Sequence, residues 1–186
     1  MTSFPVVSFV ATAPSLLCGV GFLVGLGIAS VTDVRSRRIP NKLVVWLALL
    51  GVVFGVISLP ASVGVMRALV SCVLGFALWS PFYALGMLGA GDVKLFAAAS
   101  CWLAPSQVFA AALLSAFAGG ILSLVGLVLA HGLGLTTFRI VHFARDPKLL
   151  STPLPVPAGR KTLPYGLAMA IGLAVVAWFP RLLTLT

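Results

Sequence analysis

The sequence predicts an all-α integral membrane protein, a bundle of about six transmembrane helices of which the fourth is short. Hydrophobic residues make up 61% of the 186 residues and charged residues only 8%. Soluble domains typically carry about 25% charged residues, so this composition excludes a soluble globule. The length fits one compact bundle. We therefore expect residues 1–186 to form a single membrane-embedded domain.

Six apolar segments are candidates for the helices of this bundle. A membrane-spanning helix needs about 20 mostly apolar residues. The segment 93–103 is shorter and, taken alone, could equally be re-entrant. The other five candidates are residues 14–31, 43–59, 65–88, 107–130 and 163–182. The first of these, residues 14–31, is expected to be retained as a helix, because residues 1–13 lack the basic region of a cleavable signal peptide.

The basic residues predict how the bundle is oriented. If all six segments span and the N-terminus lies outside, ten of the twelve Lys and Arg residues are cytoplasmic, and only Arg67 and Arg181 lie outside. If residues 93–103 do not span, five Lys and Arg residues are cytoplasmic and seven lie outside. Cytoplasmic loops are enriched in Lys and Arg, so six spans are favoured. The net charge of +9 then reflects membrane orientation, and no nucleic-acid partner is expected.

The longest polar region is residues 131–162, which we expect to be a cytoplasmic loop. Residues 137–144 could form a short basic amphipathic helix on the membrane surface. The second half is predicted to be extended or loop-like, because it contains four prolines: Pro147, Pro153, Pro155 and Pro157.

Acidic residues are scarce: there is no glutamate, and the aspartates are Asp33, Asp92 and Asp146. Asp33 ends the first predicted span and Asp92 begins the fourth, so the predicted topology puts both on the cytoplasmic side. A carboxylate at a membrane boundary is costly to keep and is a functional candidate. Two of them on separate helices could share a proton and activate water. Asp146, followed by Pro147, is interpreted as a solvated turn residue.

Both candidate aspartates also have structural interpretations. Asp92 precedes a helix, where Asp is a favoured N-cap and its charge suits the helix dipole, so capping and catalysis are about equally supported. Asp33 lies at a helix C-terminus, where the dipole disfavours negative charge. A pair with Arg35 or Arg37 could hold it, although exposed ion pairs contribute only about 0–1 kcal/mol. The functional interpretation is therefore stronger for Asp33.

Glycine and lysine flank Asp92 in the segment G-A-G-D-V-K. Gly89 and Gly91 lack Cβ atoms and would let an extended substrate strand approach Asp92. Lys94 follows on the same segment and is a candidate for the substrate approach.

Two further motifs begin helices. Pro40 and Asn41 start the helix after Asp33, with Asn41 as the expected cap. Pro164, Tyr165 and Gly166 open the last span, where Pro suits a helix start and Gly permits close packing. Tyr165 could be an interfacial anchor, and a role of this motif in lining the site is weaker.

The remaining reactive residue types do not form a recognisable site. Cys18, Cys72 and Cys101 lie in apolar segments without C-x-x-C spacing, and are interpreted as core-filling residues. His131 and His142 have no partners at ligand spacing, so no metal or cofactor is expected. No serine lies in a G-x-S-x-G context, so a serine hydrolase has no support.

Together, three motifs resemble the prepilin peptidase family: D-x-R-x-x-x-I-P-N at residues 33–41, G-A-G-D-V-K at 89–94 and P-Y-G at 164–166. The chain looks most like the short CpaA/TadV-type branch, the leader peptidases of Flp (tight-adherence) pilus systems. The resemblance extends from about the first span to the last, and the order and spacing of the motifs agree. G-x-G-D alone would be weak, whereas the combination is fairly specific.

The resemblance implies an aspartic endopeptidase of the inner membrane with Asp33 and Asp92 as its catalytic pair. Such enzymes cleave the basic leader of type IV pilin-like precursors on the cytoplasmic side. The expected partners are thus a prepilin substrate and the lipid bilayer, with the pilus assembly machinery as a further candidate. The N-terminal domain with two C-x-x-C pairs of long members has no counterpart here, so N-methyltransferase activity is not expected.

Two other functions stay open from the sequence. A small transporter or channel component would use the aspartates to bind a cation or relay protons, although paired broken helices are lacking. A non-catalytic assembly protein of a pilus or secretion machine would not need them at all.

Overall fold

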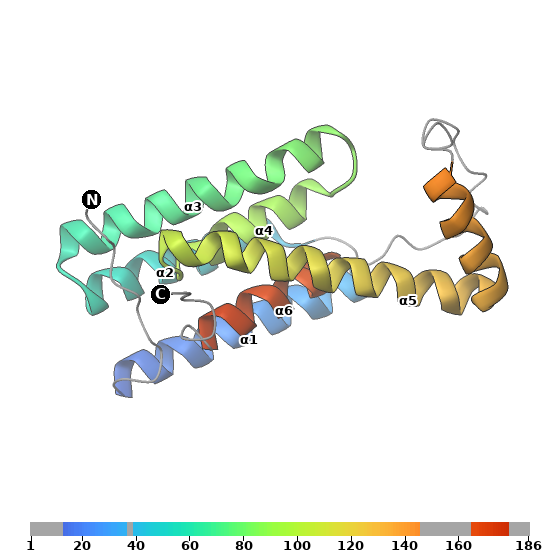
Figure 1. Cartoon of the computed structure of the whole chain (residues 1–186). Helices are drawn as coiled ribbons and strands as arrows, with labels where there is room; N and C mark the ends of the chain where they lie inside the picture. Colours follow the sequence, from blue (N-terminus) through green and yellow to red (C-terminus); the bar gives the residue numbers. More distant parts are fainter. Residues whose placement is uncertain (1–12, 37–38, 146–164, 179–186) are drawn as a thin grey trace. The chain divides into compact units, whose positions relative to one another are not determined.

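The computed structural model describes residues 13–36, 39–145 and 165–178, and this part of the chain contains helices and no strand. The fourth helix is short, as predicted. Figure 1 shows the six helices: α1 (Ala13–Ser36), α2 (Asn41–Ser58), α3 (Ala61–Ala84), α4 (Ala90–Ser100), α5 (Pro105–Arg145) and α6 (Tyr165–Trp178).

The chain divides into two compact units, which are described separately. One unit comprises residues 1–119 and 164–186, and the other comprises residues 120–163. Helix α5 begins in the first unit and continues through the second as far as Arg145. The helix predicted at residues 137–144 is therefore part of α5, and the predicted loop at 131–162 is helical up to residue 145. Its proline-rich second half lies outside the described residues.

Four helices of the described chain are long and apolar enough to cross a membrane. They comprise Leu17–Ser36, Asn41–Ser58, Ala61–Ala84 and Pro105–Gly126. Large apolar side chains point outward from these helices, including Trp46, Val73 and Phe117, each more than 60% exposed. This is the pattern expected of a lipid-facing surface. The all-α membrane fold is therefore confirmed.

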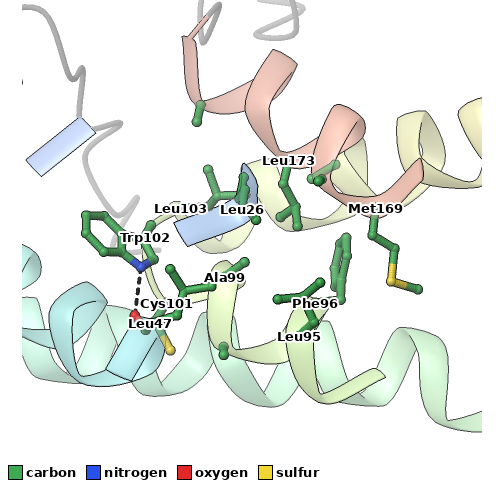
Figure 2. Close-up of a cluster of buried hydrophobic side chains, with 14 of the residues drawn as sticks. Leu26, Leu47, Leu95, Phe96, Ala99, Cys101, Trp102, Leu103, Met169 and Leu173 are labelled. Atoms are coloured by element: carbon green, nitrogen blue, oxygen red, sulfur yellow. Dashed lines mark hydrogen bonds between the residues drawn. The ribbon is translucent and has the colours of Figure 1, made fainter. Parts of the chain in front are cut away.

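The short helix α4 is the centre of the first unit. It contacts α1, α2, α3 and α6. Its residues from Leu95 to Ser100 are all buried, and Figure 2 shows Leu95 and Phe96 within the core beside Met169 and Leu173 of α6. A helix of 11 residues is only about 16 Å long, against about 30 Å for the hydrocarbon core of a bilayer. By its length, α4 reaches only part of the way through such a layer.

The turn after α4, residues 101–104, is buried, and each of its residues is at most 2% exposed. Non-helical backbone at membrane depth is tolerated only where the protein satisfies its polar groups. Ser71 Oγ of α3 donates to the Leu103 carbonyl at 2.9 Å, and the Ala104 N–H donates to Gln107 Oε1 at 2.9 Å. These bonds let the chain reverse direction inside the bundle.

Trp102 anchors the same turn to α2. Its Nε1 donates to the Leu47 carbonyl at 2.9 Å, the dashed line in Figure 2. Its ring centroid lies 5.1 Å from that of Phe22 and 5.5 Å from that of Phe54. Because Leu47 and Ser71 belong to the middle of their helices, the turn lies at about half the depth of α2 and α3.

Helices α2 and α3 touch through glycine. A Cβ at Gly55 would lie 2.8 Å from the Gly64 carbonyl oxygen, and a Cβ at Gly64 would overlap the backbone of Gly55. Small residues allow this close approach of two membrane helices. Arg67, which the charge count assigned to the outer side at the start of the predicted span 65–88, is fully buried one turn further along α3, with its guanidinium 5.8 Å from the centre of the Phe54 ring.

We predict that Gly64→Ala destabilises the protein by about 1–3 kcal/mol, because the added methyl group must push α2 away from α3. Gly21→Ala is the matched control, since a Cβ there meets nothing within 4 Å. Thermal unfolding in detergent measures both. Equal melting temperatures for the two variants would contradict the glycine contact.

Candidate active site

Asp33 is buried near the end of α1, with 7% of its surface exposed. Its Oδ2 accepts a hydrogen bond of 2.9 Å from the backbone N–H of Gly166, in the first turn of α6. First-turn amides lack a partner within their own helix, and the helix dipole is positive at that end. The dipole of α1 disfavours a carboxylate at this position, and the N-terminus of α6 supplies the compensating donor.

Only glycine fits opposite this carboxylate. A Cβ at residue 166 would lie 2.8 Å from Asp33 Oδ2 and 3.1 Å from its Cγ. The sequence predicted that Gly166 allows close packing, and the structure adds that its N–H binds Asp33. Pro164, the first residue of this motif, lies outside the described residues.

Contacts with α5 fix the start of α6. Tyr165, expected as an interfacial anchor, is half-buried, and its ring lies against the backbone at Gly119, where a Cβ would be 2.9 Å from Cε1. Ser115 Oγ donates to the Met169 carbonyl at 3.3 Å. Sequence reasoning missed Gly119 and Ser115, because small residues in a long apolar run give no local signal.

Asp92 is the third residue of α4 and is half-buried, and Gly89 occupies the N-cap position. The carboxylate folds back over Gly89, with Oδ2 3.2 Å from where a Cβ of that residue would lie. A hydrogen bond with the Gly89 backbone makes this a capping contact from the third position. Asp92 is therefore not the N-cap residue that the capping interpretation expected, and its carboxylate bonds to the Gly89 backbone from the first turn of α4 instead.

The structure brings the two aspartates into electrostatic contact at one end of the bundle. Burial and the negative charge of Asp33 raise the pKa of the Asp92 carboxyl to about 6, and the hydrogen bond with Gly89 only partly opposes this rise. Ile39, in the link between α1 and α2, packs against Gly91, where a Cβ would lie 3.6 Å from the Ile39 Cβ. Gly91 thus accommodates Ile39, a contact that the sequence did not suggest.

The other predicted site residues lie at the edge of this arrangement. Lys94 is exposed on α4. Pro40 occupies the N-cap position of α2 without a side-chain hydrogen bond, and Asn41 is the first helical residue and is exposed. The expectation that Asn41 caps α2 is therefore wrong, because the extended backbone of Pro40 already takes that position. Within the described residues, no three His, Cys, Asp or Glu side chains gather where they could hold a metal ion.

The raised pKa of Asp92 predicts a pH-dependent stability. The folded protein holds this proton up to about pH 6, whereas an unfolded Asp releases it near pH 3.9. The stabilising contribution is complete below about pH 4 and is lost as the pH rises through about 6. Melting temperatures in detergent should fall across this range, and less so for Asp92→Asn. If melting temperature depended on pH equally in the unaltered protein and in Asp92→Asn, the raised pKa of Asp92 would be contradicted.

No curated protein and no solved structure matches the chain at a significant level. Residues 20–124 match the model of the type IV leader peptidase family, a segment that contains both Asp33 and Asp92 and ends before Gly166. Because the match covers more than half of the chain, this membrane protein belongs to the type IV leader peptidase family.

Proposed function

We propose that the chain is an aspartic endopeptidase that removes the basic leader from type IV prepilins of the Flp type at the cytoplasmic face of the inner membrane. The observation that carries the proposal is the charge interaction between two buried or half-buried carboxylates in a membrane peptidase. The prepilin substrate follows from the family. The Flp branch is supported by the three sequence motifs.

The geometry supports different roles for the two carboxylates. Asp33 accepts the Gly166 N–H and carries the negative charge that raises the pKa of Asp92. Asp92 therefore keeps the shared proton near neutral pH more readily than an ordinary carboxyl. In the proposed reaction, Asp33 takes a proton from water as the water attacks the scissile carbonyl, and Asp92 gives its proton to the carbonyl oxygen. A tetrahedral gem-diol results.

Collapse of this intermediate completes the reaction. The C–N bond breaks, a proton from the gem-diol passes to one aspartate, and the leaving amine takes a proton from the other. The pair thereby returns to one shared proton and is ready for a second turnover. Hydrolysis needs no further reactant than water, so no cofactor is part of the proposal.

The surroundings of the pair fit a substrate that enters from the membrane. Gly89 and Ala90 are exposed at the start of α4, so the backbone next to Asp92 is accessible to an extended strand. Lys94 lies on the same exposed start of α4. The apolar helix of a prepilin would rest among the lipid-facing helices and present its leader at this end. The cytoplasmic assignment of this end is supported by the excess of basic residues predicted on that side.

We predict that Asp33→Asn and Asp92→Asn each lower leader cleavage at least about 10³-fold, because each removes one partner of the acid–base pair. Cleavage of a prepilin encoded by the same organism, measured in detergent, tests this. Asp146→Asn is the control and should retain full activity. Full cleavage by either site variant rules out the pair, and pilus assembly that is normal in both would favour a non-catalytic assembly role.

We also predict that Gly166→Ala lowers kcat by about 10²-fold, since its methyl group displaces the Asp33 carboxylate by part of an ångström or more. Gly27→Ala is the matched control on α1, where a Cβ meets nothing within 4 Å. Steady-state kinetics and melting temperatures should be recorded together. An unchanged kcat for Gly166→Ala would contradict the requirement for close contact between residue 166 and the Asp33 carboxylate.

A further inference from the structure

A second feature of the site end is a set of exposed basic side chains, here called the basic rim: Arg35, Lys42 and Lys94. Arg35 lies in the last turn of α1 and Lys42 in the first turn of α2, which follows after a short link. Lys94 lies near the start of α4, whose first turn packs against Ile39 of that link. Three helices thus bring these cations to the end that carries the carboxylate pair.

The basic rim forms no ion pair among the described residues. Asp33 and Asp92 are the only carboxylates there, and neither forms an ion pair with the rim. Asp33 is committed to Gly166, and Asp92 to Gly89. The rim therefore presents its charges outward, to whatever surrounds this end of the bundle.

The side chains next to the rim are of the types that favour the lipid headgroup layer as this surrounding. Val34 and Val45, beside Arg35 and Lys42, are 52% and 56% exposed, as lipid-facing residues are. Trp46 is 64% exposed in the first turns of α2, and Tyr83 is 51% exposed at the end of α3. Exposed Trp and Tyr are typical of the boundary between acyl chains and headgroups. The basic side chains and the aromatic side chains thus independently indicate that this end of the bundle lies at the level of the lipid headgroups.

We propose that the basic rim binds the phosphate groups of anionic phospholipids, so that the carboxylate pair is surrounded by these lipids. Basic side chains at a membrane surface attract anionic headgroups, and the attraction weakens with salt. This inference depends on the membrane location and not on the proposed cleavage reaction.

Spin-labelled lipids in vesicles of phosphatidylcholine that contain the full chain test the proposal. Labelled phosphatidylglycerol should associate with the protein about two- to fivefold more strongly than labelled phosphatidylcholine, and the preference should shrink in high salt. The variant Arg35→Gln/Lys42→Gln/Lys94→Gln should reduce the ratio toward one. A ratio of one for the unaltered protein, or an unchanged ratio in the variant, overturns the proposal.

Four further measurements separate the alternatives. Arg139→Gln/Arg145→Gln/Lys148→Gln removes the same charge from the segment 120–163 and should keep most of the preference; an equal loss would overturn the assignment to the rim. Inorganic phosphate should compete no better than chloride at the same ionic strength, and stronger competition would indicate a site for free phosphate instead. Asp33→Asn should keep the lipid preference whether or not the chain cleaves prepilins. If the triple variant misfolds, Lys42→Gln/Lys94→Gln should still lower the ratio, and an unchanged ratio in that variant overturns the proposal.

Discussion

The site depends on one hydrogen bond, from the Gly166 amide to the Asp33 carboxylate. A buried carboxylate in an apolar bundle is costly unless charge-assisted hydrogen bonds compensate for lost water. Here the donor comes from 133 residues away in the sequence, so the bond also joins the first helix to the last. The requirement for glycine at position 166 and the packing of Tyr165 on α5 both serve to bring the end of α6 against Asp33.

The second carboxylate is positioned by a different constraint. Asp92 belongs to a helix that ends inside the bundle, and the turn that follows it must satisfy its own polar groups. Ser71 and Gln107 bond to the backbone of this turn, and the ring of Trp102 bonds to α2. The burial of residues 95–100 leaves α4 little freedom to shift. The two aspartates are thus held by unlike means, one by a donor from another helix and the other by the rigid placement of its own helix.

Much of this arrangement could be predicted from the sequence. Long apolar runs predict helices directly, and the scarcity of acids draws attention to Asp33 and Asp92. The partner of Asp33 could not be predicted, because every residue except proline has a backbone N–H and the sequence does not indicate which one is the donor. The sequence suggested Gly166 only as a packing residue, and the contact that requires glycine there is visible only in three dimensions. Asn41 failed as a cap for a local reason, since Pro40 precedes it with extended backbone.

The contact between Gly55 and Gly64 has a consequence for biogenesis. Arg67 is buried in the folded protein. In an isolated α3 helix, an arginine at the bilayer centre would raise the free energy of membrane insertion by about 2.5–3.5 kcal/mol. Helices α2 and α3 are joined by a link of only two residues, and their glycines let the backbones meet at once. The ring of Phe54 is then already beside the guanidinium. The two helices therefore gain from leaving the insertion machinery as a pair, before α4 has been synthesised.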